Sequence, residues 1–161
     1  ATLAVAIGLH CGLRINEIRE RLTSTELPER RLAVTKSFNN SIMIDDTYNS
    51  NPASLRNALD CLEKLDKKKV CILGEMKELG KGSKKIHKDS LEYASKRADK
   101  ILCLGDSWLE DNLDKSNKIV VFTDRDELYE YLVSLIDENT ILLVKGSRST
   151  KMDLIADKLK K

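Results

Sequence analysis

A short acidic and amide-rich segment, DDTYNSNP, holds the side chains in this chain best suited to chemistry. Its polar members are Asp45, Asp46, Tyr48, Asn49 and Asn51. Adjacent carboxylates repel each other unless a cation or a hydrogen-bond donor lies close to them. A ribose, a magnesium-bound phosphate or a ligand amine would each supply such a partner, so the segment predicts a ligand site.

Part of this segment also has a structural explanation. Asn51 is a favourable helix N-cap, and the proline after it suits the first position of a helix. Asn49 is a residue type that tight turns accept. Capping does not explain Asp45, Asp46 and Tyr48, so these three residues carry the prediction of a ligand.

A cationic segment, VKGSRSTK, follows the last apolar run of the chain. It places Lys145, Ser147, Arg148 and Lys151 just before a predicted helix. Backbone donors at a helix start, a hydroxyl group and cations together bind anions well. Because cations at a helix start oppose the helix dipole, we predict contact with a phosphate or another anion.

Between these segments lies the glycine-containing stretch EMKELGKGS, residues 75–83. It is either part of the same site or only a long connection from a strand to a helix. His87 follows in a predicted helix, where a lone histidine is expected to have a packing or surface role. The chain contains neither a Gly-x-x-x-x-Gly-Lys-Ser/Thr phosphate loop nor a Gly-x-Gly-x-x-Gly dinucleotide motif.

The composition narrows the class of protein. With 28 basic and 26 acidic residues the charges nearly cancel, which argues against a nucleic-acid binder. No signal peptide and no apolar span of membrane length is present, so we expect a cytosolic protein. The four cysteines form no Cys-x-x-Cys pair and are expected to be reduced and structural.

Hydrophobic periodicity indicates which elements position these segments. Two short helices are expected within residues 1–24, and Pro28 marks a domain boundary. Beyond it we expect strands at 31–37, 41–46, 69–74, 100–105, 118–122 and 140–146. Helices are expected at 52–65, 83–98, 125–137 and from about 151, with a turn at Asn39 and Asn40 and a short helical piece near Trp108.

The later strands are continuous apolar runs, which is typical of strands buried on both faces. We therefore predict an α/β fold: a Rossmann-like three-layer sandwich with a mostly parallel sheet and one antiparallel strand. Two helices in residues 1–29 precede this domain, which spans residues 30–161. Such sheets bind ligands at the carboxyl ends of their strands, where the polar segments occur.

The segments DDTYNSNPASL, ILGEMKELG and VKGSRSTKMD, in this order, resemble the C-terminal domain of Mur ligases, in the branch that adds D-alanyl-D-alanine. The resemblance covers essentially the whole chain and implies that residues 1–29 are the last helices of a central ATP-binding domain. It implies an ATP- and Mg²⁺-dependent ligase that joins a UDP-N-acetylmuramoyl tripeptide to D-alanyl-D-alanine through an acyl phosphate. This reaction makes a peptidoglycan precursor in the cytoplasm.

The resemblance also implies roles for individual residues. Asp46, Asn49 and Asn51 would contact nucleotide and substrate, and Arg31 would meet ATP. Lys145, with Ser147 and Arg148 beside it, would lie near the phosphate or acyl phosphate and is the expected catalytic residue. Mg²⁺ would be bound mainly by the central domain, and no metal ligand is expected here. The family often has Gly-Arg-Leu-Glu where this chain has RRLA, an aspartate at Glu75 and a glutamate at Asp153.

The chain opens without Met, directly in a helix-like sequence, so we expect a portion of a longer, monomeric enzyme. Without a phosphate loop this portion is not expected to catalyse ligation alone. Two alternatives remain: the C-terminal domain of a folylpolyglutamate synthase-like ligase, which YNSNP and KGSR disfavour, and a non-catalytic α/β binding module.

Overall fold

The computed structural model of the chain describes residues 2–25, 28–109 and 117–160; residues 26 and 27, at the predicted domain boundary, lie outside this description. The strands are β1 (Ala33–Lys36), β2 (Ile42–Asp46), β3 (Lys68–Gly74), β4 (Lys100–Leu104), β5 (Ile119–Phe122) and β6 (Thr140–Lys145). The helices are α1 (Thr2–His10), α2 (Ile15–Ser24), α3 (Pro52–Glu63), α4 (Ser83–Ser95), α5 (Arg125–Leu135) and α6 (Asp153–Leu159). Short 3₁₀ turns are η1 (Phe38–Asn40), η2 (Gly80–Gly82), η3 (Asp106–Trp108) and η4 (Arg148–Thr150).

The strands form one sheet in the order β1-β2-β6-β3-β4-β5. Strand β1 runs antiparallel to β2, and every other neighbouring pair is parallel. Strand β6, the last in the sequence, lies between β2 and β3. Its final residue, Lys145, is therefore paired with Asp46 of β2 on one side and Leu73 of β3 on the other.

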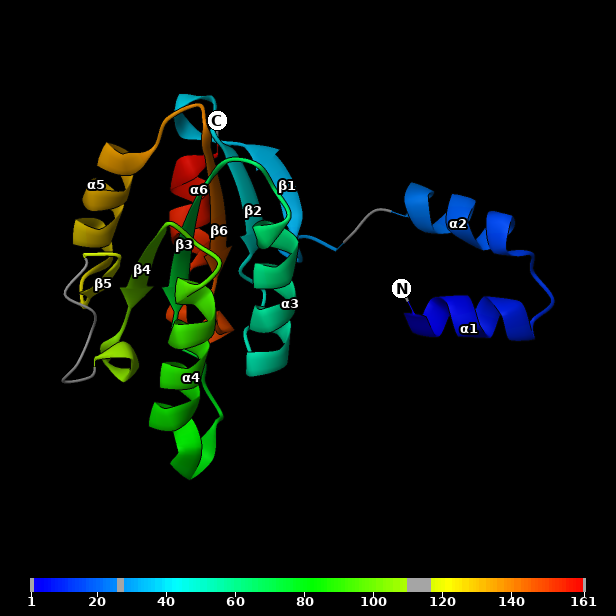
Figure 1. Cartoon of the computed structure of the whole chain (residues 1–161), viewed down its shortest axis with the longest axis horizontal. Coiled ribbons are helices and arrows are strands. Elements are labelled where there is room, and N and C mark those ends of the chain that lie inside the picture. Colours follow the sequence, from blue (N-terminus) through cyan, green and yellow to red (C-terminus); the bar gives the residue numbers. More distant parts are fainter. Residues whose placement is uncertain (1, 26–27, 110–116, 161) are drawn as a thin grey trace.

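Two helical layers cover the sheet, α3 and α4 on one face and α5 and α6 on the other (Figure 1). Alternate residues of a central strand enter the two cores: Cys71 and Leu73 of β3 pack with α3 and α4, while Val70 and Ile72 pack with α5 and α6. Burial on both faces explains why these strands are continuous apolar runs. The predicted three-layer fold, with its mostly parallel sheet and one antiparallel strand, is confirmed.

Helices α1 and α2 form a hairpin that stands apart from the sandwich in Figure 1. They pack closely at Gly8, where a Cβ atom would lie only 2.8 Å from Cδ1 of Ile18. Apolar side chains of α1 are also open to solvent, since Leu3 is 73% exposed and Ile7 is 55% exposed.

The predicted elements are all present, and their ends differ by a few residues. The helices predicted at 52–65, 83–98 and 125–137 end at Glu63, Ser95 and Leu135, because the chain turns there toward the next strand. The turn predicted at Asn39 and Asn40 is confirmed, and both residues have left-handed backbone angles, φ 51° and 58°.

Glycine is required where β4 leaves the sheet. Gly105 has φ +115°, and a Cβ atom there would lie 2.4 Å from Cγ of Glu75. We expect Gly105→Ala to lower the free energy of unfolding by about 2–4 kcal/mol, since it adds strain and a clash. Gly80→Ala is the control: its φ is +63°, but it has open space around it, so about 1 kcal/mol is expected. Urea unfolding measures both values, and equal losses would contradict the clash.

Candidate functional site

The two carboxylates that end β2 are both buried and both have partners within the chain. Asp45 is 1% exposed. Its Oδ1 accepts hydrogen bonds from the backbone N–H of Thr47 at 3.2 Å and from the Thr47 hydroxyl at 2.6 Å. Its Oδ2 lies 2.9 Å from Nζ of Lys160, just after α6. Asp45 therefore links β2 to the end of the chain and does not require a ligand.

Asp46 is held from two directions. Its Oδ1 accepts a hydrogen bond from the backbone N–H of Leu32 at 3.2 Å, which fastens the segment before β1. Its Oδ2 lies 2.5 Å from Nζ of Lys145, whose side chain is 1% exposed. Lys145 also donates to the backbone carbonyl of Asn49 at 3.0 Å. The predicted acidic and cationic segments thus neutralise each other at the sheet edge.

The loop after β2 leads into α3 through a helix cap. The side chain of Asn51 accepts a hydrogen bond from the backbone N–H of Ser54 at 2.8 Å, and the Ser54 hydroxyl accepts one from the Asn51 backbone. The side chain of Asn49 accepts from the Ser50 N–H at 2.8 Å. The capping role predicted for Asn51 is confirmed, whereas no tight turn is found at Asn49. The side chains of both residues also border the cavity described below.

Tyr48 and Arg31 form an exposed pair beside this loop. The Arg31 guanidinium lies 4.1 Å from the centre of the Tyr48 ring, and Tyr48 is 47% exposed. The backbone N–H of Tyr48 donates to the carbonyl of Arg30 at 3.1 Å. The pair presents a flat cationic and aromatic surface where the chain enters the sandwich.

The loop after β3 is fastened to the loop after β6 through Ser147. The Ser147 N–H donates to the carbonyl of Glu75 at 3.1 Å, and the Ser147 hydroxyl accepts from the Lys77 N–H at 2.9 Å. The same hydroxyl lies 3.4 Å from the carbonyl of Ser50. Ser147 is 5% exposed. Its contacts join the loops after β2, β3 and β6.

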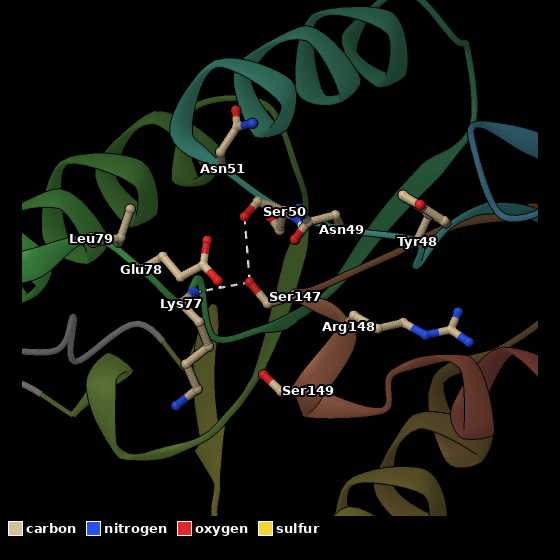
Figure 2. A pocket seen from close by; sticks show the side chains of 10 residues that line it. All are labelled: Tyr48, Asn49, Ser50, Asn51, Lys77, Glu78, Leu79, Ser147, Arg148 and Ser149. Carbon is tan, nitrogen blue, oxygen red and sulfur yellow. Dashed lines mark hydrogen bonds between the residues drawn. The ribbon is translucent and has the colours of Figure 1, made fainter.

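These three loops enclose an open cavity of about 830 Å³. Figure 2 shows the side chains around it, with the two contacts of Ser147 in the centre. The lining residues are Tyr48, Asn49, Ser50, Asn51, Lys77, Glu78, Leu79, Ser147, Arg148 and Ser149. The lining includes cations, a carboxylate, amides and hydroxyls, so this cavity suits a polar ligand that carries charge.

The charged groups at the cavity differ in whether they have a partner among the described residues. Among the described residues the Arg148 guanidinium has no hydrogen bond and no ion pair, and its side chain is exposed. Lys77 is paired with Glu75, which also accepts from the Ser107 hydroxyl and, at 2.8 Å, from the Ser107 N–H. Burial alone would raise the pKa of Glu75, but these hydrogen bonds outweigh it and lower that pKa to about 2.

The structure brings most of the predicted residues together. Tyr48, Asn49, Asn51, Ser147 and Arg148 border the cavity, whereas Asp46 and Lys145 lie buried beneath its rim and Arg31 stacks on Tyr48. Whether each binds substrate stays a prediction.

Sequence reasoning missed Lys77, Glu78, Leu79, Ser50 and Ser149, which also line the cavity. The glycine-containing stretch after β3 was the signal for Lys77, Glu78 and Leu79. The sequence alone leaves the role of this stretch open, because it does not show that β3 is a neighbour of β6.

The described residues show no cluster of metal-ligating side chains. They include no group of three His, Cys, Asp or Glu side chains placed to hold a metal ion. The two adjacent carboxylates are already neutralised by Lys160 and Lys145.

The fold and the cavity define a three-layer α/β domain with a polar cavity at the carboxyl ends of β2, β6 and β3. Residues 30–148 match the family model described as Mur ligase, glutamate ligase domain. The chain belongs to the Mur ligase family.

Similar proteins agree with this membership. The chain is 31% identical, over 99% of its length, to the UDP-N-acetylmuramoyl-tripeptide–D-alanyl-D-alanine ligase of Haemophilus influenzae, and 34% identical to that of Buchnera aphidicola, also over 99%. A crystal structure of MurF from Acinetobacter baumannii superimposes with a TM-score of 0.82 at 29% identity, over 96% of this chain and 35% of that one. The chain spans 36% and 35% of the two enzymes. No helix in the described part of the chain is long and apolar enough to cross a membrane.

Removing one partner of the buried pair Lys145–Asp46 should strongly destabilise the fold. Lys145→Met leaves the Asp46 carboxylate without its cation, and we expect the free energy of unfolding to fall by about 3–5 kcal/mol. The double variant Lys145→Met/Asp46→Leu removes both charges and should recover at least half of that loss. Denaturant unfolding of both variants measures the difference. A double variant as unstable as the single one would show that the charges are not coupled.

The low pKa of Glu75 predicts a specific acid sensitivity. Because the pKa is lower in the folded state, the stabilisation is complete above about pH 5 and is lost as pH falls toward 2. Glu75→Gln should reduce the free energy of unfolding at pH 7 by about 1–2 kcal/mol and flatten its decline below pH 5. Unfolding curves from pH 7 to pH 2.5 test this. If the free energy of unfolding of the variant declined below pH 5 as steeply as that of the wild type, Glu75 would not be the source of the acid sensitivity.

Proposed function

We propose that this chain is part of an ATP-dependent amide ligase that adds D-alanyl-D-alanine to a UDP-N-acetylmuramoyl tripeptide in peptidoglycan precursor synthesis. The observation that carries the proposal is the cavity, built by the three motifs that resemble this branch of the family. The support from comparison is the identity of 31% and 34% to ligases of this name over 99% of the chain.

The proposed reaction joins a carboxylate to an amine. ATP supplies the phosphoryl group that converts the tripeptide carboxylate into an acyl phosphate, and the amine of D-alanyl-D-alanine then displaces phosphate. Two anions and an amine must be held together while charge is neutralised. The part of the enzyme described here contributes positioned cations, amides and hydroxyls to that task.

The cavity suits the acceptor dipeptide, which has an amine at one end and a carboxylate at the other. Arg148 is an unpaired cation for the carboxylate, and Glu78 is an exposed anion for an ammonium group. The Ser149 hydroxyl and the amide of Asn49 offer further hydrogen bonds. We propose that Arg148 orients the dipeptide so that its amine faces the acyl phosphate.

Buried Lys145 has a different role in this proposal. Its ammonium group already contacts Asp46 and the carbonyl of Asn49, so it acts by holding the loop after β2 in place. The proposed nucleotide contacts are Arg31 and Tyr48, whose stacked, exposed surface suits a ring and a phosphate group.

We also propose a domain organisation. Residues 1–29 would be the last helices of a central ATP-binding domain that also holds Mg²⁺, and residues 30–161 the C-terminal domain that closes over it. The exposed Leu3 and Ile7 support this, because an apolar helix face of this kind is usually covered. The enzyme would act in the cytoplasm, where ATP is available, and we propose that it does so as a monomer.

The runner-up activity has weaker support. A bifunctional folylpolyglutamate synthase/dihydrofolate synthase superimposes with a TM-score of 0.63 at 20% identity, which shows a common fold alone.

Arg148 gives the sharpest test of the proposed acceptor site. In the enzyme expressed from its whole gene, Arg148→Ala should raise KM for D-alanyl-D-alanine at least tenfold, about 1.4 kcal/mol, and change KM for ATP much less. Phosphate release with tripeptide substrate measures both constants. Lys84→Ala, an exposed residue of α4 outside the cavity, removes the same charge and should leave both constants unchanged. A wild-type enzyme that releases no phosphate with D-alanyl-D-alanine would overturn the proposed function.

A further inference from the structure

His87 is a buried histidine that contacts the cavity loop from behind. It belongs to α4, is 1% exposed and does not line the cavity. Its Nε2 accepts a hydrogen bond from the backbone N–H of Met76 at 3.0 Å. Its Nδ1 lies 2.8 Å from the backbone carbonyl of Ser83, one helical turn earlier.

These two contacts define the form of the imidazole. An N–H donor at Nε2 requires an unprotonated nitrogen there, and a carbonyl at Nδ1 requires a proton on that nitrogen. The neutral ring with hydrogen on Nδ1 satisfies both. The ring also meets Trp108 edge to face, with centroids 4.5 Å apart and an interplanar angle of 88°. His87 is therefore fixed in orientation by three neighbours.

Met76 connects His87 to the residues that line the cavity. It is 1% exposed, and the three residues after it, Lys77, Glu78 and Leu79, line the cavity. Glu78 has φ 64°, a left-handed angle that the loop must hold against its local preference. Without an acceptor at His87, the buried Met76 N–H would lose its partner, and the loop would be free to move to recover one.

We propose that His87 is a positioning residue for the cavity: it holds the Met76 amide and thereby fixes Lys77, Glu78 and Leu79 around the ligand. A packing role alone would need only the shape of the ring against Trp108. The acceptor nitrogen Nε2 distinguishes the positioning role from a packing role. Only a side chain with a hydrogen-bond acceptor at the place of Nε2 can hold the Met76 N–H. The identity of the ligand as D-alanyl-D-alanine rests on the proposed function, whereas the positioning role of His87 does not.

Two variants separate acceptor from shape. His87→Phe keeps a ring against Trp108 but has no acceptor, whereas His87→Gln has a carbonyl oxygen that can reach the Met76 amide but has no ring. In this chain, hydrogen exchange at the Met76 amide should be at least tenfold faster in His87→Phe and within threefold of wild type in His87→Gln. If the phenylalanine variant does not fold, His87→Asn replaces it, since its shorter amide reaches Ser83 but not Met76.

The enzyme expressed from its whole gene gives the functional readout. His87→Phe should raise KM for D-alanyl-D-alanine about tenfold with a smaller change in KM for ATP, and His87→Gln should restore it to within threefold. Equal exchange at Met76 in both variants, or equal KM in both, would overturn the positioning role. Wild-type enzyme without ligation would refute the proposed function, while the exchange experiment would still decide the role of His87.

Discussion

The buried ion pair between Lys145 and Asp46 is the constraint on which the site depends. The parallel register of β6 and β2 places the two residues side by side at the carboxyl edge of the sheet. A buried ammonium group without a partner would be very costly, so the pair fixes how the loops after β2 and β6 leave the sheet. The second contact of Lys145, to the carbonyl of Asn49, extends this order to the rim of the cavity.

Around this pair, some polar groups hold the loops in place through contacts within the chain, even where, like Ser147, they also border the cavity, while other charged groups are exposed at the cavity. Ser147, Glu75 and His87 are occupied by other parts of the chain and are mostly buried. Arg148 and Glu78 are exposed at the cavity. Such a division suits binding, because groups already paired keep the loops rigid while unpaired groups remain available to a ligand.

The fold was predictable because its signals are local. Apolar strands buried on both faces, periodic helices and the cap at Asn51 are all visible within a few neighbouring residues. The site was predictable only in part. The sequence indicated that Asp45 and Asp46 need cationic or donor partners, but it assigned those partners to a ligand. The actual partner of Asp46 is Lys145, 99 residues away, and sequence order does not show that β6 lies beside β2.

The sequence alone determined the layered α/β architecture and the three polar segments at strand ends, since hydrophobic periodicity and residue type are sufficient for both. The tertiary structure decided which polar groups neutralise one another and which remain free. It did so by inserting β6 between β2 and β3, which brings Lys145 against Asp46 and Ser147 against the loop after β3. Pairing between distant residues depends on strand order, and strand order is a property of the folded chain.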